Sequence, residues 1–258
     1  MVRDESAGRA GAASLSKTDF PVPKKAMVFA AGLGTRMQPV TDTIPKPLIA
    51  VGGRPMIDHM LDRLVEAGVE EAVVNLHYKA DQIETHLARR ERPHIVFSDE
   101  RDLLLDQAGG LRKALPLLGD DPIFICNTDA LWLEGPASNL TALATWWQPA
   151  IMDILLLVAA TTSSVGVDWP GDFLMDADGR LRRRAEREVA PFVYTGAGIV
   201  KPSLFKDMPE GPVRLAPYFF AAAEQGRLFG HRLDGQWLHV GTPGAIGEAE
   251  ERIKRSVY

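Results

Sequence analysis

Short apolar runs alternate with segments of helical periodicity along the first half of the chain. Four strands are expected at residues 26–31, 69–76, 94–97 and 122–126, and the first and last of these are apolar runs typical of strands buried in a parallel sheet. Three segments between them carry apolar residues at helical spacing and begin near Met56, Ala80 and Leu111. This alternation predicts an α/β fold with a doubly wound, mostly parallel sheet and helices on both faces.

The second half of the chain is less regular, but it continues the same architecture. Two further strands are expected at residues 152–160 and 192–200, and a turn at residues 176–179 predicts a hairpin from Asp172 to Leu181. Helices are expected at residues 215–225 and 245–253. We therefore predict one domain over residues 25–258, preceded by a flexible tail at residues 1–24.

The composition of the chain excludes several classes of protein and of site. The chain has 258 residues and a formal net charge of −5, which argues against sequence-independent binding of nucleic acid. Its single cysteine, Cys126, excludes an internal disulfide and a cysteine-based metal site. No signal-peptide core is found near the start, and the longest apolar run, residues 154–160, is too short for a bilayer. We expect a cytoplasmic protein that binds neither nucleic acid nor membrane.

The chemistry is concentrated after two of the buried strands. A glycine-containing loop with Arg36 and Lys46 follows the first strand, and Asp129 follows the strand at residues 122–126. Ligands of parallel sheets gather at the carboxyl ends of strands, and such a loop lets backbone amides approach a polyphosphate. Met37 stands where a dinucleotide-binding fingerprint has its third glycine, and the Gly-Lys-Ser/Thr of a Walker loop is absent. The alternative for the glycine pair is a tight turn without a ligand.

The motifs resemble those of the sugar-phosphate nucleotidyltransferases. The family pattern L-A-A-G-x-G-T-R, followed by P-L-T and P-K-P-L, is matched at residues 29–36, 39–41 and 45–48. Weaker matches continue at residues 53–57, 109–110, 127–129, 194–196 and 240–242, so the resemblance covers nearly the whole chain after residue 25. Within the family the chain is most similar to the short uridylyltransferases that act on N-acetylmuramic acid 1-phosphate, through residues 171–173, 213–217 and 235–242.

The resemblance implies a role for each matching residue. Arg36, Lys46 and Asp129 are the catalytic candidates, with Asp129 as ligand of a Mg²⁺ ion. The loop before the third helix is expected to read the nucleobase. The candidate nucleotide contacts are Ala31, Gly32, Gly34, Thr35, Gln107, Gly109 and Gly110, and the candidate sugar contacts are Asp172, Thr195 and Gly196. The resemblance therefore implies two halves of the domain: a nucleotide-binding half at about residues 25–130 and a sugar-binding half at about 131–258.

Two features depart from the family pattern. His239 stands where relatives carry a second metal-binding aspartate. If His239 does not bind metal, Asp129 holds Mg²⁺ with the phosphates; if it does, the site favours Mn²⁺. The remaining alternatives are that His239 contacts the sugar phosphate or is a packed structural residue. The family's Glu-Lys-Pro is absent, and Arg182, Arg183, Arg184 and Arg187 occupy the region. This run is either a solvated face or a partner for the lactyl carboxylate of muramic acid.

The resemblance thus implies an enzyme that joins UTP and N-acetylmuramic acid 1-phosphate and releases pyrophosphate, in peptidoglycan recycling. Rival interpretations are another sugar 1-phosphate, a phosphoalcohol cytidylyltransferase, and an inactive relative that binds nucleotide sugars and regulates a partner. The chain is expected to be a monomer or a small homo-oligomer.

Overall fold

The computed structural model describes residues 22–256, so most of the tail predicted at residues 1–24 lies outside the described part. The first strand, β1 (Lys25–Phe29), lies in the middle of a nine-stranded sheet. Four strands run parallel in the order β5-β4-β1-β6, with β4 at Glu71–Leu76, β5 at His94–Asp99 and β6 at Ile123–Asn127. The chain moves away from β1 on one side and returns on the other, so the crevice between β1 and β6 is the topological switch point.

The remaining strands extend the sheet beyond β6. Strand β11 (Phe192–Val200) runs antiparallel to β6 and to β8 (Ile154–Ala160), and β12 (Leu228–Arg232) lies parallel to β8. The predicted hairpin is formed by β9 (Phe173–Met175) and β10 (Leu181–Arg183), which pair near the start of β11. The sheet is therefore mixed, with its parallel part in the first half of the chain.

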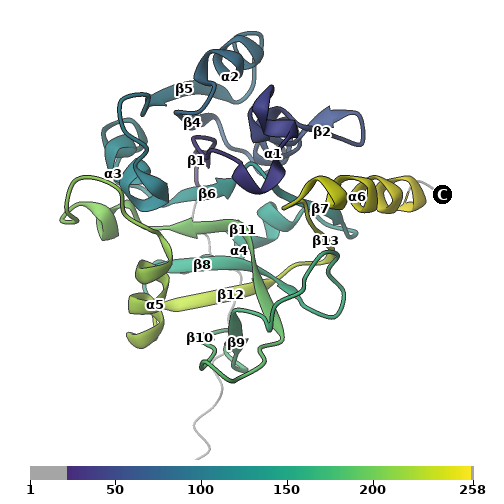
Figure 1. Cartoon of the computed structure of the whole chain (residues 1–258). Coiled ribbons are helices and arrows are strands. Elements are labelled where there is room, and N and C mark those ends of the chain that lie inside the picture. Colours follow the sequence, from purple (N-terminus) through teal and green to yellow (C-terminus); the bar gives the residue numbers. More distant parts are fainter. Residues whose placement is uncertain (1–21, 257–258) are drawn as a thin grey trace, which may run out of the picture.

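Helices cover both faces of the sheet, as predicted (Figure 1). One face packs against α1 (Met56–Glu66), α2 (Ala80–Leu87) and α4 (Asn139–Trp146), and the other against α3 (Asp106–Leu118) and α5 (Ala216–Glu224). Because successive strand residues point to opposite faces, Ala26 and Val28 of β1 join the first cluster and Met27 and Phe29 the second. No helix among residues 22–256 is long and apolar enough to cross a membrane.

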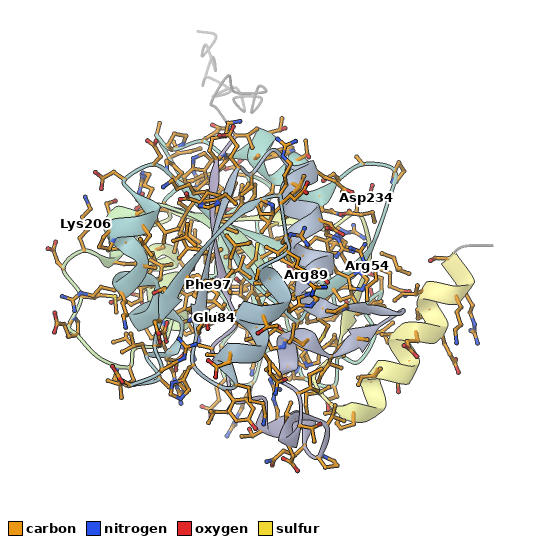
Figure 2. The ribbon with its side chains drawn as sticks, turned by 90° about the horizontal axis from the view of Figure 1, so that it is seen from above. Arg54, Glu84, Arg89, Phe97, Lys206 and Asp234 are labelled. Carbon is orange, nitrogen blue, oxygen red and sulfur yellow. The ribbon has the colours of Figure 1, made fainter. Side chains whose placement is uncertain are left out.

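A smaller layer closes the edge of the molecule beside the switch point. Strand β7 (Ala130–Glu134) pairs with β13 (Gly235–His239) in a separate two-stranded sheet, and α6 (Pro243–Ser256) follows. Figure 2 shows α6 at the rim of the molecule. Glu250 of this helix accepts a hydrogen bond from the amide of Gly52. Gly52 lies in the turn between β2 (Ala50–Val51) and β3 (Arg54–Pro55). The short helical turns are Thr35–Met37, Val40–Asp42, Lys46–Leu48 and Pro202–Phe205.

Three expectations from the sequence need correction. Helix α3 begins at Asp106 rather than near Leu111, so residues 107–110 lie within the helix and not in a loop before it. Strands β12 and β13 were not expected, and neither was β7, because each pairs with a segment distant in sequence. The strand expected at 94–97 continues to Asp99.

Candidate active site

The loop after β1 is folded tightly around Gly34. This residue has φ of +65°, which favours glycine, and a Cβ there would lie 2.8 Å from Cγ2 of Thr41 and 3.2 Å from Cβ of Lys46. Its carbonyl accepts hydrogen bonds from the Met37 amide at 2.8 Å and from the Thr41 hydroxyl at 3.0 Å. Gly34 therefore fixes the turn that brings Arg36 and Lys46 to the same side of the loop.

Lys46 and Asp129 meet across the switch point. The Nζ of Lys46 donates to Oδ2 of Asp129 at 2.5 Å, which joins the loop after β1 to the end of β6. The side chains are 12% and 26% exposed, so water screens the pair only in part. A lysine ammonium has three donors, and two remain for other acceptors. This arrangement brings together two of the three predicted catalytic residues.

Arg36 and the predicted backbone contacts line one cavity of about 810 Å³ in front of this pair. Arg36 forms no ion pair with another described side chain, so its guanidinium is available to an anion. The predicted residues in the cavity wall are Ala31, Gly32, Gly34, Thr35, Arg36, Lys46, Gln107 and Asp129. The wall thus combines a glycine-containing loop with positive charge, which suits a polyphosphate.

Arg214 is a further cation in this wall that the sequence reasoning missed. It precedes α5, lines the cavity, and has no ion-pair partner among the described residues. Its loop is held against the start of α3, because the Ala108 and Gly109 amides both donate to the Val213 carbonyl, at 2.9 and 3.2 Å. The string at residues 213–217 marked this segment, but it did not indicate that Arg214 faces the nucleotide cavity.

The glycines of α3 are packing residues in this structure. A Cβ on Gly109 would lie 2.3 Å from the Gly211 carbonyl oxygen, and one on Gly110 would lie 2.5 Å from Oε1 of Glu100. Neither glycine lines the 810 Å³ cavity, whereas Gln107 does and donates to Oδ1 of Asn127 at 2.7 Å. Contact between Gln107 and a nucleobase stays a prediction.

One of the three predicted sugar contacts, Asp172, lines a second cavity of about 750 Å³ between the β9–β10 hairpin and α5. Its carboxylate already accepts hydrogen bonds from Nε1 of Trp169 and the amide of Tyr194. Thr195 is buried, and its hydroxyl donates to the Leu157 carbonyl at 2.9 Å. Neither Thr195 nor Gly196 lines this cavity, although their neighbour Tyr194 does. Gln107 lines both cavities, so the two adjoin.

His239 lies at the end of β13, beside two tryptophans. Its ring centre is 5.2 Å from that of Trp169 and 5.3 Å from that of Trp237. Burial lowers the pKa of His239 below its ordinary value of 6.5, and the charges of Lys46 and Arg36 lower it too, against the opposing effect of Asp129 and Asp168. The imidazole therefore lies within electrostatic reach of the Lys46–Asp129 pair.

The donors present fit a divalent cation only if it is shared with substrate phosphates. Residues 22–256 contain no cluster of three or more His, Cys, Asp or Glu side chains that could hold a metal. Asp129 offers one carboxylate, and Mg²⁺ is commonly held by one or two carboxylates together with phosphate oxygens. Contact between Asp129 and a divalent cation therefore stays a prediction.

The chain is similar to known proteins over most of its length. The family model described as nucleotidyl transferase matches residues 25–154, which include the glycine-containing loop and Asp129. The chain is 48% identical over 235 residues to the N-acetylmuramate alpha-1-phosphate uridylyltransferase of Caulobacter vibrioides, covering 90% of this chain and 97% of the relative. It is 36% identical over 230 residues to the protein of the same name from Neisseria meningitidis serogroup B, covering 88% and 96%.

The fold is also found in solved structures. A putative glucose-1-phosphate thymidylyltransferase from Bacillus anthracis, in complex with a sucrose, superimposes with a TM-score of 0.74. The alignment covers 88% of this chain and 94% of that chain at 16% identity. The mostly parallel α/β sheet with helices on both faces is therefore confirmed.

Proposed function

We propose that this chain, which belongs to the nucleotidyl transferase family, joins UTP and N-acetylmuramate α-1-phosphate to give UDP-N-acetylmuramate and pyrophosphate. The observation that carries the reaction class is the meeting of Arg36, Lys46 and Asp129 in one cavity at the switch point. The choice of base and sugar is supported by two relatives of that name, which align over nearly their whole length. The proposed setting is peptidoglycan recycling in the cytoplasm.

The reaction needs alignment and charge neutralisation more than proton transfer. A sugar 1-phosphate is an anion at neutral pH, so its oxygen attacks the α-phosphorus of UTP without a general base, in line with the departing pyrophosphate. Arg36, Lys46 and Arg214 line the nucleotide cavity and are assigned to the phosphate oxygens. We assign the uracil to the side of the cavity formed by Leu104, Asp106 and Gln107.

A divalent cation, taken here as Mg²⁺, would be held by Asp129 together with the phosphates, where it would neutralise charge. Lys46 has a second function in this scheme, because its ammonium holds the Asp129 carboxylate in position and keeps two donors for phosphate. The adjoining 750 Å³ cavity is assigned to the sugar.

The test is a matrix of pyrophosphate-release rates. UTP, dTTP, CTP, GTP and ATP are each combined with the 1-phosphates of N-acetylmuramate, N-acetylglucosamine, glucose and mannose. We expect the largest kcat/KM for UTP with N-acetylmuramate 1-phosphate. A larger kcat/KM for another pair would replace the proposed substrates, and absence of pyrophosphate release from every pair would favour the inactive regulatory relative.

Asp129→Asn tests the proposal that Asp129 holds the divalent cation. The variant keeps the shape of the side chain and removes its charge, so we expect kcat to fall at least about 100-fold, as when charge stabilisation of a transition state is lost. The melting temperature serves as the control for folding. A folded variant that keeps a tenth of the wild-type activity would remove Asp129 from the cation site.

A further inference from the structure

The 750 Å³ cavity has an aromatic wall with one available cation. Its wall includes the aromatic residues Phe173, Tyr194, Phe219 and Phe220 together with residues 183–186. The Tyr194 hydroxyl itself is buried, so the ring and not the hydroxyl faces a ligand. A ligand with a small apolar group would suit such a wall.

The arginines that follow Leu181 differ sharply in their surroundings. Arg182 points away from the cavity and gives both ends of its guanidinium to Glu188, at 2.9 and 2.8 Å. Arg184 lines the cavity, but its Nε donates to the Gly171 carbonyl at 2.8 Å and its Nη1 to the carbonyls of Ala185 and Glu186. The guanidinium groups of Arg182 and Arg184 are therefore both hydrogen-bonded within the protein.

Arg183 is available for a ligand. Strand residues alternate between faces, so Arg183 shares the face of the buried Leu181, on which α5 packs, and Arg182 takes the other face. Its guanidinium carbon lies 4.1 Å from the centre of the Phe220 ring, and no acidic side chain in residues 22–256 forms an ion pair with it. Stacking on Phe220 orients the planar group and leaves its N–H edges free.

The two carboxylates that line the same cavity, Asp172 and Glu186, form no ion pair with Arg183. Asp172 accepts hydrogen bonds from the Trp169 and Tyr194 N–H groups, and Glu186 is exposed. An arginine fork binds a carboxylate with two parallel hydrogen bonds, and the aromatic wall accepts a small apolar group beside it. N-acetylmuramate differs from N-acetylglucosamine by a lactyl ether, which consists of a carboxylate and a methyl group on one carbon.

We propose that Arg183 binds the lactyl carboxylate and sets the preference for N-acetylmuramate 1-phosphate over N-acetylglucosamine 1-phosphate. The inference rests on the proposed function, since it takes the sugar from that assignment. It makes Arg183 a specificity-determining residue and gives Arg182, one position away, a structural ion pair instead.

The test compares Arg183→Gln with the matched variant Arg182→Gln. With UTP we expect Arg183→Gln to lower kcat/KM for N-acetylmuramate 1-phosphate about 10- to 100-fold, the usual effect of losing a charged hydrogen-bond pair. The value for N-acetylglucosamine 1-phosphate should change less than about twofold, because that sugar has no carboxylate to lose a partner. Arg182→Gln should change neither value appreciably, and Arg183→Lys should recover part of the loss.

Binding of the product nucleotide sugars, measured by calorimetry, gives a second measurement that is independent of turnover. Arg183→Gln should raise the Kd of UDP-N-acetylmuramate and leave that of UDP-N-acetylglucosamine unchanged. Equal effects on both sugars, or equal effects of Arg182→Gln and Arg183→Gln, would overturn the inference and leave the proposed function intact. A wild-type enzyme that does not use N-acetylmuramate 1-phosphate would overturn both.

Discussion

At the scale of single residues, the surroundings of His239 bear on which ion the enzyme uses. The ring packs against both Trp169 and Trp237, which also contact each other, and a Cβ on Gly241 would lie 2.5 Å from its Nε2 atom. This packing favours a structural imidazole, and an imidazole is in any case a poor ligand for Mg²⁺. The cation would then depend on Asp129 and the substrate phosphates.

His239→Phe tests this interpretation, because it keeps an aromatic ring against the two tryptophans and removes both nitrogens. We expect the ratio of activity with Mg²⁺ to activity with Mn²⁺ to stay within about threefold of wild type, since no metal ligand is lost. Pyrophosphate release measured with each ion checks this. A selective loss of the Mn²⁺-dependent activity would instead make His239 a ligand.

At the scale of secondary-structure elements, the start of α3 fixes the loop that carries Arg214. The Gly211 carbonyl approaches Gly109 so closely that a methyl group would have to push the backbone away. Gly109→Ala should therefore cost about 1–3 kcal/mol of stability, as overpacking does in closely packed cores. It should also raise the KM for UTP, because the Arg214 loop would move.

Gly247→Ala in α6 is the matched control, since nothing lies within 4 Å of the site of its Cβ. This change should leave KM unchanged and stabilise the helix slightly. Thermal unfolding and the KM for UTP measure both effects. An unchanged KM in Gly109→Ala would separate the start of α3 from nucleotide binding.

Asp153 joins three strands of the sheet by its side chain. It accepts hydrogen bonds from Lys201 at 2.7 Å and from Nε and Nη2 of Arg227 at 2.7 and 2.9 Å. Burial alone would raise the pKa of Asp153, but these bonds outweigh it and hold the pKa below its ordinary value of 3.8. The charged form therefore stabilises the fold above pH 3.8, and this contribution is lost as the pH falls through the lower folded-state pKa.

Asp153→Asn should lower the free energy of unfolding by about 1–2 kcal/mol at pH 7, because hydrogen bonds between charged groups are weakened. The difference from wild type should shrink as the pH falls below the ordinary pKa. Urea unfolding at pH 7 and at pH 3 measures it. Asp178→Asn, which removes an exposed pair with Arg180, should change stability little at either pH.

At the scale of the whole molecule, α6 packs against the segment that carries Arg36 and Lys46. Ala249 of α6 is buried in a cluster with Met37, Ile49 and Val51, which all belong to the segment from the first loop to β2. Ala249→Asp would put a charge into this cluster and should cost about 2–4 kcal/mol. Because residues 35–51 would lose this support, their amide hydrogen exchange should accelerate and kcat should fall. Glu248→Asp, on the exposed face of α6, is the control and should change neither quantity.

The parallel half of this architecture could be predicted because its signals are local. Strand β6, for example, consists largely of the apolar run at residues 123–126, and the loop residues Arg36 and Lys46 belong to a contiguous motif. Long-range pairing could not be predicted in the same way: β13 finds its partner about 100 positions earlier, and nothing in residues 235–239 specifies β7. Gly109 and Gly110 have low intrinsic helix propensity, and the close contacts that select them in α3 come from distant residues.

The same difference between local and long-range signals applies to the two cavities. The nucleotide cavity was largely predictable because most of its predicted members surround the ends of β1 and β6. Arg214 and Arg183 were not distinguishable from other arginines, since their availability depends on which neighbours take up the surrounding charges. A sequence pattern specifies a residue type, whereas availability is a property of the packed structure.

The pairing of β7 with β13 has a consequence for synthesis on the ribosome. The nascent chain delivers β1, the cation-bearing loop and β6 early, but the apolar underside of that loop stays uncovered until β13 and α6 emerge. A ribosome that stalls between β7 and β13 would therefore expose this loop, which is proposed to bind substrate, without its support, a form suited to capture by a chaperone. A polypeptide shortened before α6 would keep Arg36, Lys46 and Asp129 but would lack the apolar support of their loop.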